Sequence, residues 1–176
     1  MTFAKVRAMI FVAVLFVTAG VVVLMAISKD TQTLPVASGC LEGQVPANIK
    51  MPERDQVTIN VYNGTPRVGL AEQVGGEFAN RGFHVGKMES MPDGGQYEQI
   101  ALITFGPEAI GAAWLVSAYF LTDTAEHNFQ LDRKGAEVDV TLGNKFQQLA
   151  TSTEVNQSIA ANGTPELEPG TCEAGT

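Results

Sequence analysis

Residues 8–27 form a run of twenty residues without a charged side chain, and most of them are Val, Leu, Ile, Phe, Met or Ala. As a helix, this run is about 30 Å long, which matches the hydrocarbon core of a bilayer. The run therefore predicts one transmembrane helix, in contact with the lipid bilayer over residues 8–27.

The charges on either side of this run predict its orientation. Residues 1–7 carry Lys5 and Arg7, and a short basic flank stays in the cytoplasm. Beyond the run stand nine Lys or Arg and nineteen Asp or Glu, a formal charge of −10. We expect a single-pass protein of the cell membrane whose C-terminal part is extracytoplasmic. The acidic balance also argues against binding nucleic acid, which needs clustered basic residues.

Two other interpretations of the N-terminal run stay open. A cleaved signal peptide has an apolar region of roughly 7–15 residues followed by a small-residue cleavage site. The run here is longer, and no such site follows it directly. A lipoprotein signal would use Ala37-Ser38-Gly39-Cys40, but Cys40 lies well beyond the run and Ala37 is a poor first residue for that motif.

The two cysteines, Cys40 and Cys172, both fall in the part predicted to lie outside the cytoplasm, where disulfides persist. They stand near opposite ends of that part, and domain termini often lie close together. We expect a disulfide that fixes the polar tail to the folded domain. Two free or intermolecular thiols are the alternative.

The rest of the chain divides into three parts by composition. Residues 28–55 contain scattered Pro, Gly and polar residues and are predicted to be an extracytoplasmic linker. Periodic apolar patterns fill residues 56–150, which we expect to fold as one domain. Residues 151–176 are polar with two prolines and predict a mobile tail.

Within 56–150 the patterns predict strands near 57–62, 83–85, 100–105, 129–131 and 138–142, and helices over 70–81 and 107–121. The order is β-α-β-β-α-β-β. Right-handed crossovers place both helices on one face of a sheet. The expected fold class is therefore α+β: an N-terminal transmembrane helix plus a two-layer sandwich of ferredoxin-like type.

Two groups of residues are candidates for binding. Asn63, Gly64, Thr65 and Gly69 lie between a predicted strand and a predicted helix, where free N–H groups can hold an anion or a sugar oxygen. A helix cap and a tight turn explain the same residues, and we favour that explanation. The second group lies on the second helix and consists of Trp114, Tyr119 and Phe120. These rings can stack on sugars or bind a partner helix, although packing in the core is the commoner use of such a pattern.

The sequence offers no recognisable catalytic or metal site. His84 and His127 are the only histidines, and neither has metal-ligand spacing to the cysteines. Gly-x-Ser-x-Gly, Ser-x-x-Lys and His-Glu-x-x-His motifs are absent. We expect a protein that is not an enzyme and that needs no metal and no cofactor.

The part from Val57 to Leu149 resembles the LytR C-terminal domain family. The matching pieces are Val57-Thr58-Ile59-Asn60-Val61-Tyr62-Asn63-Gly64-Thr65, Gly69-Leu70-Ala71, Arg81-Gly82-Phe83, and Asp139-Val140-Thr141-Leu142-Gly143 with Phe146. As a set these pieces are moderately specific, and each alone is weak.

In that family the domain often follows a LytR-CpsA-Psr catalytic domain, which transfers glycopolymers onto peptidoglycan. No such catalytic domain fits between the apolar run and the first predicted strand. The arrangement resembles stand-alone actinobacterial members with one anchor and flanking cysteines. The resemblance implies a non-catalytic protein that supports cell envelope integrity by binding peptidoglycan or the LytR-CpsA-Psr ligases. Two alternatives are a regulatory subunit of a membrane complex that does not contact polymer, and an unrecognised cell-wall hydrolase or transferase.

Overall fold

The computed structural model of this chain describes residues 40–91, 94–121 and 124–173. The predicted transmembrane helix at residues 8–27 lies outside these residues. Among the helices that are described, none has the length and apolar character needed to traverse a bilayer.

The strands, in chain order, are β1 (Val45–Ala47), β2 (Thr58–Asn63), β3 (His84–Ser90), β4 (Ala101–Phe105), β5 (Ala125–Phe129), β6 (Val138–Leu142) and β7 (Thr171–Glu173). The helices are α2 (Leu70–Asn80), α3 (Ile110–Ser117) and α4 (Ser152–Asn162), with 3-10 turns η2 (Arg54–Gln56), η3 (Pro107–Ala109) and η4 (Ala118–Phe120). The part from β2 to β6 follows the predicted order of elements, and the α+β class is confirmed.

The main sheet has the strand order β3-β2-β6-β4-β5. Strand β2 is parallel to β3 and to β6, and β4 is parallel to β5 but antiparallel to β6. The ferredoxin-like topology is therefore wrong. A split βαβ unit leaves another strand between its two parallel strands, whereas here each βαβ unit pairs its own strands directly. The order of elements does not decide which strands pair, and β6 fills the place between the two units.

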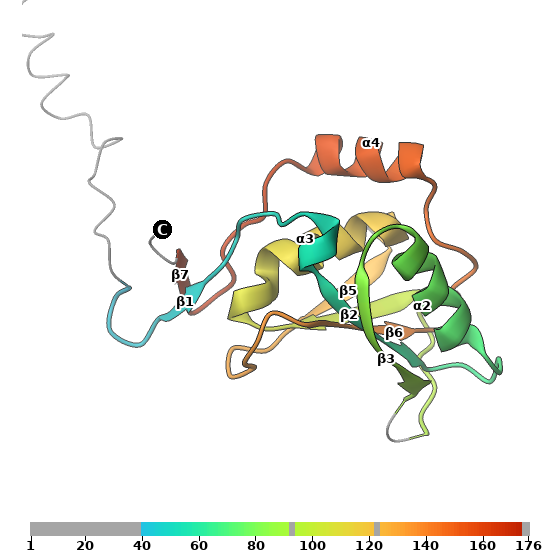
Figure 1. The fold of residues 1–176 in the computed structure, drawn as a ribbon. Helices are drawn as coiled ribbons and strands as arrows, with labels where there is room; N and C mark the ends of the chain where they lie inside the picture. The colour runs from blue at the N-terminus through green and yellow to red at the C-terminus, as the bar shows by residue number, and fades with distance from the viewer. Residues whose placement is uncertain (1–39, 92–93, 122–123, 174–176) are drawn as a thin grey trace, which may run out of the picture. The chain divides into compact units, whose positions relative to one another are not determined.

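Helices α2 and α3 lie on the same face of this sheet, as expected (Figure 1). The core between helices and sheet is rich in aromatic rings. Phe78 of α2 packs against Phe83 and Tyr119, with ring centroids 5.5 and 5.7 Å apart. Burying such rings is the main stabilising contribution that a core of this size makes.

Glycines mark both ends of α2. Gly69 precedes the helix with φ 77°, and Gly82 follows it with φ 93°. Both angles lie in the left-handed region, which glycine adopts without a steric penalty. The helix itself ends at Asn80, one residue before the end of the predicted range 70–81.

Residues 28–55 were predicted to be a linker. Residues 45–50 are instead part of the folded domain. Strand β1 pairs in parallel with β7, and the side chain of Ala47 is buried. The Gly111 N–H donates to the Asn48 carbonyl at 3.0 Å, so this segment contacts the start of α3. Strand β1 is three residues long, too short to show a periodic pattern in the sequence.

The predicted mobile tail is also wrong within the described residues, because it contains α4 and β7. A capping box begins α4: the Thr151 side chain accepts from the Glu154 N–H, and the Glu154 carboxylate accepts from the Thr151 N–H at 2.7 Å. Val155 is buried and Ile159 packs against the core. Figure 1 shows α4 over the helix layer, on the side away from the sheet.

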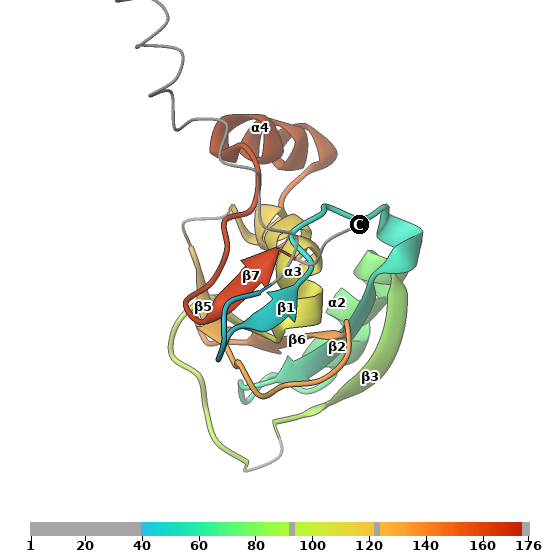
Figure 2. The same cartoon turned by 90° about the vertical axis from the view of Figure 1, so that its left-hand side faces the viewer.

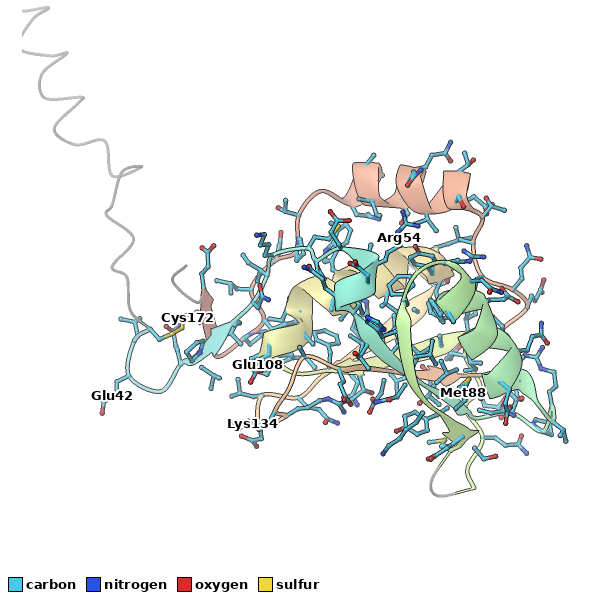
Figure 3. All side chains as sticks on the ribbon, in the orientation of Figure 1. Glu42, Arg54, Met88, Glu108, Lys134 and Cys172 are labelled. Carbon is cyan, nitrogen blue, oxygen red and sulfur yellow. A yellow bond between two sulfur atoms is a disulfide. The ribbon has the colours of Figure 1, made fainter. Side chains whose placement is uncertain are left out.

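The predicted disulfide is present. Cys40 and Cys172 are bonded, with Cα atoms 5.4 Å apart and a sequence separation of 132 positions. The bond lies beside the β1–β7 pair, and Figure 2 shows these two strands side by side. Figure 3 shows the sulfur atoms at Cys172. The two ends of the described chain are thus held together by a covalent bond.

Candidate functional site

A cavity of about 360 Å³ lies between α3, β5 and the chain that follows α4. Its lining combines apolar rings, one imidazole and several polar or acidic groups: Phe105, Ile110, Trp114, His127, Asn162, Thr164, Glu166, Leu167 and Glu168. A concave site with apolar surface and a few polar groups is the usual form of a small-ligand site. The volume is at the lower end for such sites, which favours a small ligand.

Trp114 supplies the aromatic surface of this cavity. Helix α3 is apolar almost all round and packs into the core, and its other described residues are buried. Trp114 is partly exposed, and it lines the cavity. The sequence singled out this residue, and the structure places it at the cavity.

The two other aromatic candidates do not join Trp114. Tyr119 and Phe120 are each 3% exposed, and their rings contact Phe78 in the core. Core packing, the alternative given for this group, therefore explains both.

His127, on β5, also lines the cavity. Its ring meets the ring of Phe105 edge-on, with centroids 5.7 Å apart. Its Nε2 lies 2.6 Å from the hydroxyl of Ser117, on α3. Partial burial lowers the pKa of His127 below the usual value of 6.5, and the nearby Glu168 carboxylate opposes that shift. The ring is therefore predominantly neutral at pH 7.

Residues 162–168, here called the wall segment, supply Asn162, Thr164, Glu166, Leu167 and Glu168 to the cavity lining. The segment leaves the end of α4 at Gly163, which has φ 72°, and runs down to β7 (Figure 2). At its lower end, the Glu168 carbonyl accepts from the N–H and the hydroxyl of Thr171, at 3.1 and 2.6 Å. The segment is thus held by α4 at one end and by β7 with its disulfide at the other.

The charged groups that line the cavity are all acidic. Glu166 is exposed and Glu168 is partly exposed, and no Lys or Arg is among the described residues that line the cavity. The potential inside is therefore negative, which disfavours anionic ligands and favours neutral or cationic ones.

The Asn63-Gly64-Thr65 turn uses its polar groups within the fold. The side-chain oxygen Oδ1 of Asn63 accepts from the N–H and the hydroxyl of Thr65, at 3.0 and 2.7 Å. The Gly64 N–H donates to the Leu142 carbonyl at 2.9 Å. These bonds favour the cap-and-turn explanation, although a cavity of about 210 Å³ lies beside the turn and beside Gly69.

Neither a metal site nor a nucleophile emerges from the described residues. No group of three His, Cys, Asp or Glu side chains is placed to hold a metal ion in the part of the chain that the structure describes. The hydroxyl of Ser117 stands beside a histidine, but the residue has no exposed surface. A nucleophile must reach its substrate, so this pair does not form an accessible catalytic dyad.

Sequence reasoning missed His127 and the wall segment. The histidine lies in a predominantly polar stretch before Phe129 and has no partner nearby in sequence, because Ser117 stands on a helix ten residues earlier. The wall segment contains Pro165, Pro169 and two glutamates, which predict a tail. The segment lines the cavity only because β7, which follows it, pairs with β1.

Comparison with known proteins gives a family and one similar solved structure. The family model described as LytR cell envelope-related transcriptional attenuator matches residues 56–146. The soluble domain of a conserved hypothetical secreted protein from Mycobacterium marinum is 23% identical, with a TM-score of 0.50. The match covers 70% of this chain and 82% of that one and supports the fold alone. No curated protein matches the chain. Because the family model spans slightly more than half of the 176 residues, the chain belongs to the LytR C-terminal domain family.

Proposed function

We propose that this chain is a membrane-anchored, extracytoplasmic protein of the cell envelope that binds peptidoglycan without catalysing a reaction. Family membership supports the role in the envelope. The Cys40–Cys172 bond supports a location outside the cytoplasm, because disulfides persist in oxidising compartments. The apolar run at residues 8–27 supports the anchor.

One observation carries the proposal of binding: the cavity that combines Trp114 with polar and carboxylate groups. A sugar ring has an apolar face and a rim of hydroxyls. An indole ring packs against the apolar face, and side chains such as Thr164 and Glu168 accept hydrogen bonds from the hydroxyls. The glycan strands of peptidoglycan present this combination along their whole length.

Sedimentation with purified, insoluble cell wall tests the proposal. The full chain is kept in detergent and compared with two variants, Trp114→Ala and Val68→Ala. Val68 is fully exposed beside the Asn63 turn, so its variant tests the rival surface. We expect the wild type and Val68→Ala to sediment with the wall, Trp114→Ala to remain largely in solution, and no reducing sugar to be released.

Each other outcome contradicts part of the proposal. If the wild type does not sediment with the wall, the proposal that the protein binds peptidoglycan is wrong. Loss of binding in Val68→Ala alone moves the site to the Asn63 turn. Release of reducing sugar makes the protein an enzyme. Circular dichroism of each variant establishes whether Trp114→Ala is still folded, and Trp114→Phe, which keeps an aromatic ring, should retain most of the binding.

A further inference from the structure

The charges around the Trp114 cavity specify more than a general preference for sugars. All formal charges on its lining residues are negative and come from Glu166 and Glu168 on the wall segment. These two residues share the cavity lining with Trp114, which lies on α3.

A protonated amine suits this arrangement in two ways. Carboxylates accept charge-assisted hydrogen bonds from an ammonium group, and these are stronger than neutral hydrogen bonds. The face of an indole ring attracts a cation and is the best of the aromatic side chains at doing so. In a sugar that carries a free amine, the ring can therefore pack against Trp114 and the charged amine can bind Glu166 and Glu168.

The same groups act against anionic ligands. A phosphate or a uronic acid would meet two like charges with no Lys or Arg among the cavity's lining residues to offset them. The chain as a whole has a formal charge of −8, so its long-range field acts in the same direction.

We propose that the Trp114 cavity is a subsite for an amino sugar whose amine is free and protonated, with Trp114 against the ring and Glu166 and Glu168 around the amine. This inference rests on the proposed function and narrows it. It predicts that the protein binds de-N-acetylated glycan more tightly than N-acetylated glycan, and that it does not bind acidic sugars.

Trp114 is itself the probe for this test, because it is the only tryptophan in the chain. Any change in tryptophan emission comes from the cavity. The full chain in detergent is titrated with three oligosaccharides of equal length: glucosamine, N-acetylglucosamine and galacturonic acid oligomers. The pH is mildly acidic, so that the amines carry protons, and the ionic strength is held constant.

We expect the glucosamine oligomer to bind tightest and the galacturonic acid oligomer to leave the emission unchanged. The variant Glu166→Gln/Glu168→Gln should bind the glucosamine oligomer about fivefold more weakly while its affinity for the N-acetylated oligomer stays the same. Added salt should weaken only the binding of the glucosamine oligomer, because salt screens exposed charges.

The matched control is Glu42→Gln/Asp55→Asn. It makes the same change in net charge at two exposed residues, one before β1 and one in η2, that line neither the Trp114 cavity nor the cavity beside the Asn63 turn. It should bind all three oligomers as the wild type does. If it loses as much affinity as the cavity variant, the preference belongs to the overall charge and the subsite is wrong.

Equal or tighter binding of the N-acetylated or acidic oligomer overturns the subsite, and so does an unchanged preference in Glu166→Gln/Glu168→Gln. The result is separable from the wall experiment. Wall sedimentation that depends on Trp114 without a preference for amines contradicts the amino-sugar subsite and keeps peptidoglycan binding. A preference for amines without wall sedimentation keeps the amino-sugar subsite and contradicts peptidoglycan binding.

Discussion

The hydroxyl oxygen of Ser117 lies 2.6 Å from His127 Nε2 and 2.7 Å from the carbonyl oxygen of Ala113. A carbonyl oxygen only accepts hydrogen bonds, and a hydroxyl has one proton to donate. The hydroxyl therefore donates to Ala113, and the imidazole donates from Nε2 to the hydroxyl. A general base would have to accept from the serine at this nitrogen. The pair consequently joins β5 to α3 and does not activate a nucleophile.

The shift at His127 makes stability depend on pH. Its pKa is lowered in the folded state, so between that lowered value and 6.5 the unfolded chain binds more protons than the folded one. The contribution of His127 to folding stability is therefore fully present above pH 6.5. It is lost as the pH falls from 6.5 toward the lowered pKa. We expect urea unfolding of the wild type to show this loss, and His127→Gln to show a flatter profile.

Replacing the other histidine provides the control for the pH experiment. His84→Gln on β3 should keep the pH dependence of the wild type. A profile for His127→Gln as steep as that of the wild type would assign the loss of stability in acid to other groups.

Two glycines on helices should respond in opposite ways to alanine. A Cβ at Gly111 would overlap the backbone of Lys50, whereas a Cβ at Gly76 would meet nothing within 4 Å. Gly111→Ala should cost about 1–3 kcal/mol, because residues 48–50 must move away from α3. Gly76→Ala should add about 0.5–1 kcal/mol, because alanine restricts the unfolded chain and suits a helix interior. Urea unfolding of both variants measures the two changes, and equal shifts would contradict this packing.

The capping box at Thr151 should contribute measurably to α4. Thr151→Ala removes the side chain that accepts from the Glu154 N–H, and loss of such a cap costs about 1 kcal/mol. Ser152→Ala, one residue further along and exposed, should change stability by less than about 0.5 kcal/mol. Hydrogen exchange in residues 152–162 localises the effect. Unchanged exchange in Thr151→Ala would show that packing alone holds the helix.

Removing the disulfide should lower both overall stability and order at the cavity. The Cys40→Ser/Cys172→Ser variant frees a loop of 132 positions, for which the chain-entropy model gives at most about 4–5 kcal/mol. The bond also holds β7, to which the wall segment is attached. We therefore expect the emission of Trp114 in the folded variant to shift toward longer wavelength as the cavity opens to water.

Reduction of the wild type with dithiothreitol should reproduce both effects of that variant and should leave the variant itself unchanged. A variant as stable as the wild type would mean that β1 and β7 hold together without the bond.

Periodic apolar patterns predicted the elements that bury many side chains. The alternation over 57–62 and 138–142 corresponds to β2 and β6, and the apolar stretch after Pro107 corresponds to η3, α3 and η4. Strands β3 and β5 have no fully buried residue, and the predicted ranges 83–85 and 129–131 overlap only one end of each. Strands β1 and β7 and helix α4 were not predicted. Strands β1 and β7 are three residues long, and α4 buries Val155 with partial burial of Ile159. Their stability comes from partners distant in sequence, which no local pattern records.

Part of the candidate site could likewise be predicted from the sequence, and part could not. Trp114 could be selected from the sequence because a large aromatic ring on a helix is conspicuous, but the sequence could not separate it from Tyr119 and Phe120. Burial separates them, and burial depends on how α3 is rotated against the sheet. Glu166 and Glu168 became part of the site only through the β1–β7 pairing.

The bond between Cys40 and Cys172 also determines how a mechanical load would pass through the domain. Tension that enters along the chain at Cys40 divides at once, one branch running through β1 toward the main sheet and the other crossing the sulfur atoms to β7. The second branch leads straight to residues 162–168. A domain held at this corner would therefore transmit part of a pull to the chain around its own cavity as well as to the main sheet.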